Sequence, residues 1–132
     1  MKLGLSIPLY NEADVVTEVV ASIHAELQRA GIESTLVLVN NGSLDDTGAI
    51  IDGLASAGQI EVVHLRQNEG YGGGILAGLA HLERAGLPDI VGWCWGDGQV
   101  SASVLPRLVA AIDAGADLAK TTRSERQDGL LR

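Results

Sequence analysis

The run Thr35-Leu-Val-Leu-Val39, followed at once by Asn40-Asn-Gly-Ser-Leu-Asp-Asp46, decides the fold of this chain. A short run without polar alternation is typical of a strand covered on both faces, as in a parallel sheet. The residues after it are turn and helix-start residues, and the segment from Thr47 to Ala57 has a helical pattern. The sequence therefore predicts a strand–turn–helix unit of an α/β protein.

The same alternation continues on both sides of this unit and predicts a mainly parallel sheet between two helix layers, a three-layer α/β/α sandwich. Strands are expected at Leu3–Ile7, Thr35–Val39, Ile60–Leu65, Ile90–Trp95 and Ala116–Thr122. Helices are expected after a cap at Asn11 as far as Gly31, over Thr47–Ala57, from the glycine-rich turn Asn68–Gly74 through Ala85, and over Ser103–Ala114.

Length and composition indicate one domain, residues 1–132, with a core of its own. The formal net charge of -8 argues against nucleic acid and against electrostatic attachment to anionic lipid. No apolar run approaches a membrane span and no signal peptide is recognised, so we expect a cytoplasmic protein. The single cysteine, Cys94, excludes a disulfide framework, and we interpret it as a small core residue.

Four polar or glycine-rich loops follow the predicted strands. They are Pro8–Glu12, Asn40–Ser43, Asn68–Gly74 and Gly96–Gln99. Because ligands of open parallel sheets bind at the carboxyl ends of the strands, the convergence of these loops predicts a ligand site.

The sharpest candidate in these loops is Asp97, which follows an apolar strand and precedes Gly98. A carboxylate in that place can hold a divalent cation against a phosphate, whereas the plainer interpretation is an Asp-Gly turn. Where a pair of acids would be expected, the position two before Asp97 holds Trp95.

The other loops have plain interpretations beside functional ones. The Pro8–Glu12 loop could bring a helix N-terminus to a phosphate and Tyr10 to a base or sugar, or be an ordinary turn. Asn40 and Asn41 could meet the edge of a nucleobase, while Asp45 is expected to cap a turn. The glycine-rich segment fits a loose dinucleotide motif only weakly, and the preferred interpretation is that its glycines let the backbone approach a ligand or the sheet.

Taken in order, these motifs resemble the nucleotide-binding half of family 2 glycosyltransferases, which have the GT-A fold. The similarity is greatest to dolichyl-phosphate mannosyltransferase and other polyprenyl-phosphate enzymes of that family. The segments that carry the resemblance are Ser6–Glu12, Val39–Thr47, Asn68–Gly78, Trp95–Gln99 and Ala116–Arg123.

The resemblance implies transfer of a sugar, with inversion, from a nucleoside diphosphate sugar to an acceptor such as a polyprenyl phosphate. It implies Mg²⁺ or Mn²⁺ held by Asp97, and catalytic roles for Asp97, Gln99 and Arg123. The residues expected to bind the nucleotide are Pro8, Tyr10, Asn11, Glu12, Asn40, Asn41, Ser43, Asp45, Asn68, Gly70, Gly72, Gly96 and Asp97. The resemblance also implies a lipid-phosphate acceptor or a membrane-bound partner, and no nucleic acid as a partner. It leaves open whether the protein attaches peripherally to a membrane and whether it forms an oligomer.

Three departures from the family pattern keep alternatives open. Asn40 and Asn41 stand in place of two acids, Trp95 replaces the first acid of an Asp-x-Asp-Gly-Gln signature, and the sequence stops before an acceptor-binding half. A non-catalytic nucleotide-sugar-binding domain, or one half of a split transferase, is therefore the main alternative. A nucleotidyltransferase is weaker, because Pro8–Glu12 is neither glycine-rich nor basic.

Overall fold

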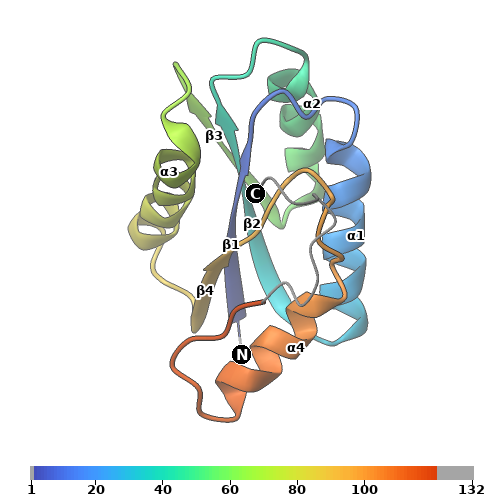
Figure 1. Cartoon of the computed structure of the whole chain (residues 1–132), viewed down its shortest axis with the longest axis vertical. Helices are drawn as coiled ribbons and strands as arrows, with labels where there is room; N and C mark the ends of the chain where they lie inside the picture. The colour runs from blue at the N-terminus through green and yellow to red at the C-terminus, as the bar shows by residue number, and fades with distance from the viewer. Residues whose placement is uncertain (1, 122–132) are drawn as a thin grey trace, which may run out of the picture.

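The computed structural model describes residues 2–121, which form a wholly parallel four-stranded sheet with helices on both faces (Figure 1). The strands are β1 (Lys2–Leu9), β2 (Glu33–Asn41), β3 (Ile60–Leu65) and β4 (Ile90–Trp93). The helices are α1 (Val16–Arg29), α2 (Thr47–Leu54), the short 3₁₀ helix η1 (Ala55–Ala57), α3 (Gly70–Arg84) and α4 (Val104–Asp113). The expected three-layer α/β/α class is confirmed.

The strand order β3-β2-β1-β4 places a change of direction at the centre of the sheet. From β1 the chain moves outward to β2 and β3, and then returns through α3 to β4 on the other side of β1. Helices α1, α2 and α4 cover one face and α3 covers the other (Figure 1). The point between β1 and β4 is therefore the switch point of the sheet, where open α/β folds bind ligands beyond the carboxyl ends of the strands.

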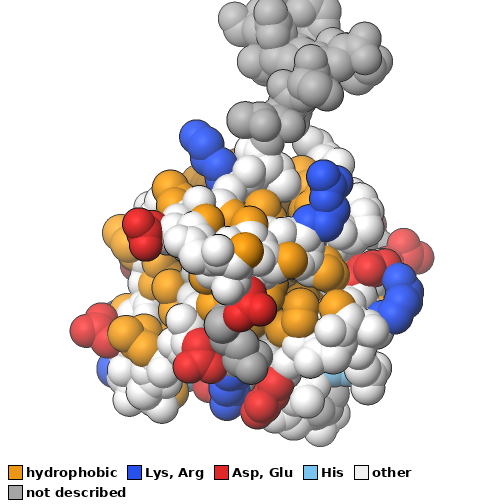
Figure 2. All heavy atoms as spheres, turned by 90° about the horizontal axis from the view of Figure 1, so that it is seen from below, with side chains coloured by type: hydrophobic (Ala, Val, Ile, Leu, Met, Phe, Trp, Pro, Cys, Tyr) orange, Lys and Arg blue, Asp and Glu red, His pale blue; other side chains and the backbone are white. Residues whose placement is uncertain are grey.

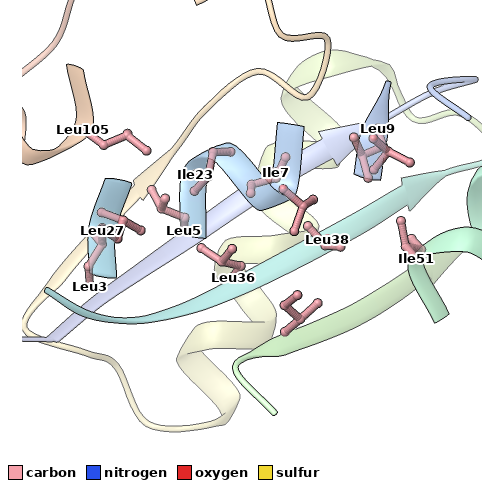
Figure 3. Packing of buried hydrophobic residues seen from close by; sticks show 13 residues of the cluster. Leu3, Leu5, Ile7, Leu9, Ile23, Leu27, Leu36, Leu38, Ile51 and Leu105 are labelled. Atoms are coloured by element: carbon pink, nitrogen blue, oxygen red, sulfur yellow. The ribbon is translucent and has the colours of Figure 1, made fainter. Parts of the chain in front are cut away.

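The main core is aliphatic and lies between the sheet and helices α1, α2 and α4 (Figure 3). Alternate residues of β1 point into it, as the two-residue period of a strand requires. Each fully buried aliphatic side chain contributes about 1.5–3 kcal/mol relative to exposure. The side chains labelled in the figure are Leu3, Leu5, Ile7, Leu9, Ile23, Leu27, Leu36, Leu38, Ile51 and Leu105.

Helix α3 lies close against β1 on the opposite face because glycines form its contact surface. A Cβ on Gly78 would lie 1.9 Å from Ser6 Oγ, and one on Gly74 would lie 2.9 Å from Pro8 Cβ. The buried Ser6 hydroxyl donates a hydrogen bond to the carbonyl oxygen of Ile75 at 3.0 Å. This close approach brings the N-terminus of α3 to the carboxyl ends of β1 and β2.

The predicted start of the first helix is wrong. Helix α1 begins at Val16 without a side-chain cap, and Asn11 instead adopts a left-handed conformation with φ of 53°. Asparagine is among the few residues that tolerate this conformation, so the residue type fits a turn as well as a cap. The residues between Asn11 and Val16 form turns, in which the Glu12 carbonyl accepts hydrogen bonds from the Val15 and Val16 amides.

Two further segments differ from the prediction, and β4 ends at Trp93 rather than at the expected Trp95. The glycine-rich segment is not a turn as far as Gly74, because α3 already begins at Gly70. The expected strand from Ala116 is wrong over residues 116–121, where the chain follows α4 without pairing to the sheet. Exposed Asp117 and Leu118 give this run no face to bury against a neighbouring strand. Thr122 and Arg123 lie outside the described residues.

Figure 2 shows the end of the molecule at which the strands begin, opposite the predicted site. Hydrophobic side chains are visible there between separate acidic and basic ones. Within residues 2–121, every helix is too short or too polar to cross a membrane.

Candidate functional site

The loops after β1 and β2 are joined by reciprocal hydrogen bonds. The Asn11 amide donates to Ser43 Oγ at 3.0 Å, and Asn11 Oδ1 accepts from the Leu44 amide at 2.8 Å. The left-handed backbone of Asn11 makes its amide and its side chain available to the same neighbouring loop. Two segments more than 30 residues apart in sequence thereby form one surface beside the switch point.

Asp45 and Thr47 form the structural centre of this surface. Asp45 Oδ1 accepts hydrogen bonds from the Thr47 hydroxyl and from the Thr47 amide, and Oδ2 accepts from the Ala13 amide at 3.3 Å. The Thr47 side-chain bond is the first cause that lowers the pKa of Asp45. Buried Thr47 Oγ1 also accepts from the Glu12 amide at 2.9 Å. The predicted turn-capping role of Asp45 is confirmed.

Two carboxylates from neighbouring loops, those of Asp45 and Asp97, lie close enough to Glu12 to act on its charge. The pKa of Glu12 is raised, first by burial of its carboxyl group and then by the negative charges of Asp97 and Asp45. Within residues 2–121, however, no three metal-ligating side chains are grouped closely enough to hold an ion by themselves. The site therefore has a negative field but no complete protein cage for a metal.

Asp97 is placed by a tight loop that presses on the end of β1. A Cβ on Gly96 would meet Leu9 Cδ2 at 2.1 Å and the Pro8 carbonyl oxygen at 3.1 Å, so only glycine fits there. Gly98 has a φ of 78°, and Asp97 Oδ1 accepts a hydrogen bond from the Gln99 amide at 3.0 Å. The Asp-Gly turn is thus real, and it holds the carboxylate at the switch point.

Trp95 stacks on Tyr71 from the first turn of α3. The ring centroids are 3.9 Å apart and the planes differ by 4°. Burial, followed by the nearby Cys94 and Asp97, raises the pKa of Tyr71 to about 12. Sequence reasoning missed Tyr71, although an aromatic residue beside a predicted ligand loop was a signal.

Cys94 packs partly buried against the main core, and burial raises the pKa of its thiol to about 12. Its interpretation as a small core residue is confirmed.

The two asparagines at the end of β2 are both engaged in the protein's own hydrogen bonds. Asn41 is buried; its Oδ1 accepts from the Glu69 amide and its Nδ2 donates to the Gly70 carbonyl, both at 2.9 Å. Asn40 Oδ1 accepts from the Ser43 amide at 3.0 Å, and its Nδ2 lies 3.0 Å from His64 Nδ1. Asn41 therefore links the end of β2 to the start of α3.

We expect Asn41→Asp to destabilise the protein by about 1–3 kcal/mol, because a carboxylate cannot donate to the Gly70 carbonyl and is buried beside it. Urea denaturation measures this loss. Asn68→Asp is the matched control, since Asn68 Oδ1 accepts from the Gly70 amide at 2.7 Å and a carboxylate keeps that bond. An Asn41→Asp protein as stable as the unmodified chain would contradict the assignment.

The remaining predicted residues occupy varied positions around the edge. Pro8 lies one residue before the end of β1, Tyr10 is exposed, and Gly70 and Gly72 lie in the first turn of α3. A Cβ on Gly72 would meet nothing within 4 Å. Arg123 lies outside the described residues. Thr47 was not predicted as a site residue, although its place two residues after Asp45 is typical of an Asp-centred turn.

Comparison with known proteins identifies the family to which this chain is similar. The model of "Glycosyl transferase family 2" matches residues 5–132. The undecaprenyl-phosphate 4-deoxy-4-formamido-L-arabinose transferase of Klebsiella pneumoniae subsp. pneumoniae is 32% identical over 99% of this chain and 39% of its own length. The protein of the same name from an Enterobacter species is 31% identical over the same shares. The chain thus spans about two fifths of the length of these curated relatives.

Solved structures show the same fold. Residues 1–349 of S. aureus TarS superpose with a TM-score of 0.67 at 23% identity, over 86% of this chain and 33% of that one. The complex of the same segment with UDP gives a TM-score of 0.66 at 24% identity, over 86% and 32%. The parallel sheet with its flanking helices is therefore the expected GT-A architecture. Since the family model matches nearly the whole chain, this protein belongs to glycosyl transferase family 2.

Proposed function

We propose that this chain binds a nucleoside diphosphate sugar at the carboxyl edge of its sheet and supplies the donor site of a sugar transferase. The observation that carries the proposal is that the loops of Glu12, Asp45 and Asp97 lie at one carboxyl edge of the sheet, where the charges of Asp97 and Asp45 act on Glu12. The curated relatives, named as undecaprenyl-phosphate sugar transferases, support a polyprenyl phosphate as the acceptor.

A divalent cation fits this site only together with the diphosphate. Mg²⁺ is commonly bound by one or two carboxylates plus substrate phosphates. Asp97 would be its protein ligand, and within the described part of the chain no group of three or more His, Cys, Asp or Glu side chains could hold the ion without nucleotide. Such a cation supplies positive charge to the leaving diphosphate. The negative charges of Asp97 and Asp45, which after burial help to raise the pKa of Glu12, support the binding of a positive charge at this edge.

In the proposed reaction, a phosphate oxygen of the acceptor attacks the anomeric carbon as the bond to the diphosphate breaks, which inverts that carbon. The nucleoside diphosphate leaves with the bonding electrons. Because the second pKa of a phosphate ester is about 6, the acceptor is ionised near neutral pH and needs no strong base. The residues of this chain then have only to bind and orient the two substrates and to shield them from water. The loops joined through Asn11 and Thr47 suit these roles.

One observation favours the second candidate, a nucleotide-sugar-binding domain without turnover. Trp95 stands where the family has an acid, and its stacking on Tyr71 occupies that position with an aromatic pair. Both candidates share the donor site, and they differ in whether sugar transfer follows.

Isothermal titration of the chain with UDP and Mn²⁺ tests the donor site. We expect UDP binding in the presence of Mn²⁺ and no measurable binding of Mn²⁺ alone, because the protein supplies one ligand and the diphosphate supplies the others. Failure of UDP, GDP and ADP alike to bind with Mn²⁺ present would contradict the proposal.

A further inference from the structure

His64 on β3 has no place in the function proposed above, yet it belongs to a chain of polar contacts that ends in the candidate nucleotide site. Its Nε2 lies 2.9 Å from Asp52 Oδ1 on α2, and its Nδ1 lies 3.0 Å from Asn40 Nδ2. The chain continues through the Ser43 amide to the loop after β1. It therefore connects α2 and β3 to both loops that the proposed nucleotide would meet.

The contacts determine the direction of each hydrogen bond in the series from Asp52 through His64 and Asn40 to Ser43. A backbone amide can only donate, so the atom of Asn40 that faces the Ser43 amide is its oxygen, and its nitrogen faces His64. The Asn40 nitrogen can only donate, so His64 Nδ1 accepts. The imidazole then carries its hydrogen on Nε2, which donates to the Asp52 carboxylate.

A second feature makes room for this arrangement. Gly48, in the first turn of α2, faces the Asn40 amide, and a Cβ there would lie 2.8 Å from Asn40 Nδ2 and 3.6 Å from His64 Cε1. The absence of a side chain at position 48 lets the amide lie against His64. The His64 and Asp52 side chains are 45% and 61% exposed, so this pair contributes little to stability.

We propose that His64, held as its Nε2–H tautomer by Asp52, is a positioning residue that fixes the orientation of the Asn40 amide for the recognition of a nucleobase. A fixed amide presents one pattern, with its free N–H on the β3 side and its remaining oxygen lone pair on the Ser43 side. Without His64 the amide keeps a single orienting hydrogen bond, from the Ser43 amide, and is expected to hold this pattern, and to distinguish bases, less well. This inference rests on the proposed function, because it assigns a role in selecting the base.

The test compares UDP and GDP binding, with Mn²⁺ present, in the unmodified chain, His64→Ala and His64→Asn. We expect His64→Ala to weaken binding of the preferred nucleotide about three- to tenfold, as the loss of one orienting hydrogen bond implies, and to reduce the UDP-to-GDP preference. His64→Asn places an amide oxygen near the former position of Nδ1 and should restore most of the nucleotide affinity and most of the UDP-to-GDP preference. His81→Ala is the matched control, because His81 pairs with Glu61 away from these loops.

Nitrogen-15 spectra of the imidazole provide a readout that does not depend on nucleotide. At pH 8 we expect His64 to show a protonated Nε2 and an unprotonated Nδ1. The opposite tautomer, or unchanged affinity and base preference in His64→Ala, would overturn the inference while leaving the donor site intact. Absence of nucleotide binding by the unmodified chain would overturn both this inference and the proposed function.

Discussion

Gly78→Ala is expected to lower the free energy of unfolding by about 1–3 kcal/mol, the usual cost of overpacking a filled core. The added Cβ would lie 1.9 Å from Ser6 Oγ and 2.6 Å from Ser6 Cβ, inside the contact between α3 and β1. Ser6 is fully buried and its hydroxyl is bonded to Ile75, so it has little freedom to move aside. The steric cost outweighs the gain of about 1 kcal/mol that alanine brings to a helix interior.

Gly53→Ala in α2 is the matched control for this prediction. Nothing lies within 4 Å of a Cβ built at Gly53, so the substitution should only add helix propensity and stabilise the protein by up to about 1 kcal/mol. Urea denaturation of both variants measures the difference. Equal stabilisation by the two alanines would show that α3 does not approach β1 as closely as described.

Asp97→Ala is expected to weaken Mn²⁺-dependent UDP binding at least tenfold, which corresponds to about 1.4 kcal/mol. The physical reason is that Asp97 is the protein carboxylate proposed to anchor the metal–diphosphate pair. Without metal the expected effect has the opposite sign, because removal of a negative charge beside Glu12 and Asp45 favours an anionic ligand. Titrations with Mn²⁺ and with a chelator measure the two effects.

Asp46→Ala removes the same charge from the neighbouring loop and serves as its control, since Asp46 makes no side-chain cap bond to α2. A loss of affinity as large as that in Asp97→Ala would indicate a general charge effect. Unchanged Mn²⁺-dependent binding in Asp97→Ala would contradict the metal assignment.

The strands could be predicted because their signal is local. The uninterrupted apolar run of β2 indicates a strand covered on both faces, and the observed Glu33–Asn41 extends the expected Thr35–Val39 only at its ends. The start of α3 could not be predicted, because glycine has a poor helix propensity and packing of Gly74 and Gly78 against β1 overrides it. Asn11 was ambiguous because asparagine suits both a helix cap and a left-handed turn.

The candidate site was predictable in position but not in detail. Parallel strands bring their following loops to one edge, so Asp97 and the loop after β1 could be expected there from sequence alone. The hydrogen-bond partners could not be predicted, since they depend on side-chain directions across several elements. Asn41 supports α3, and Trp95 stacks on Tyr71, contacts between segments more than 20 residues apart.

The most direct test of the donor site is an NMR titration of the nitrogen-15-labelled chain with UDP and Mg²⁺, in which the chemical-shift change of each backbone amide is measured. We predict shifts at the carboxyl edge, in the amides of Asn11–Ala13, Ser43 and Gly96–Gln99, with those of Glu33 and Asp89 at the opposite end unchanged. No shift at millimolar UDP, or shifts confined to the end where the strands begin, would contradict a nucleotide site at the switch point.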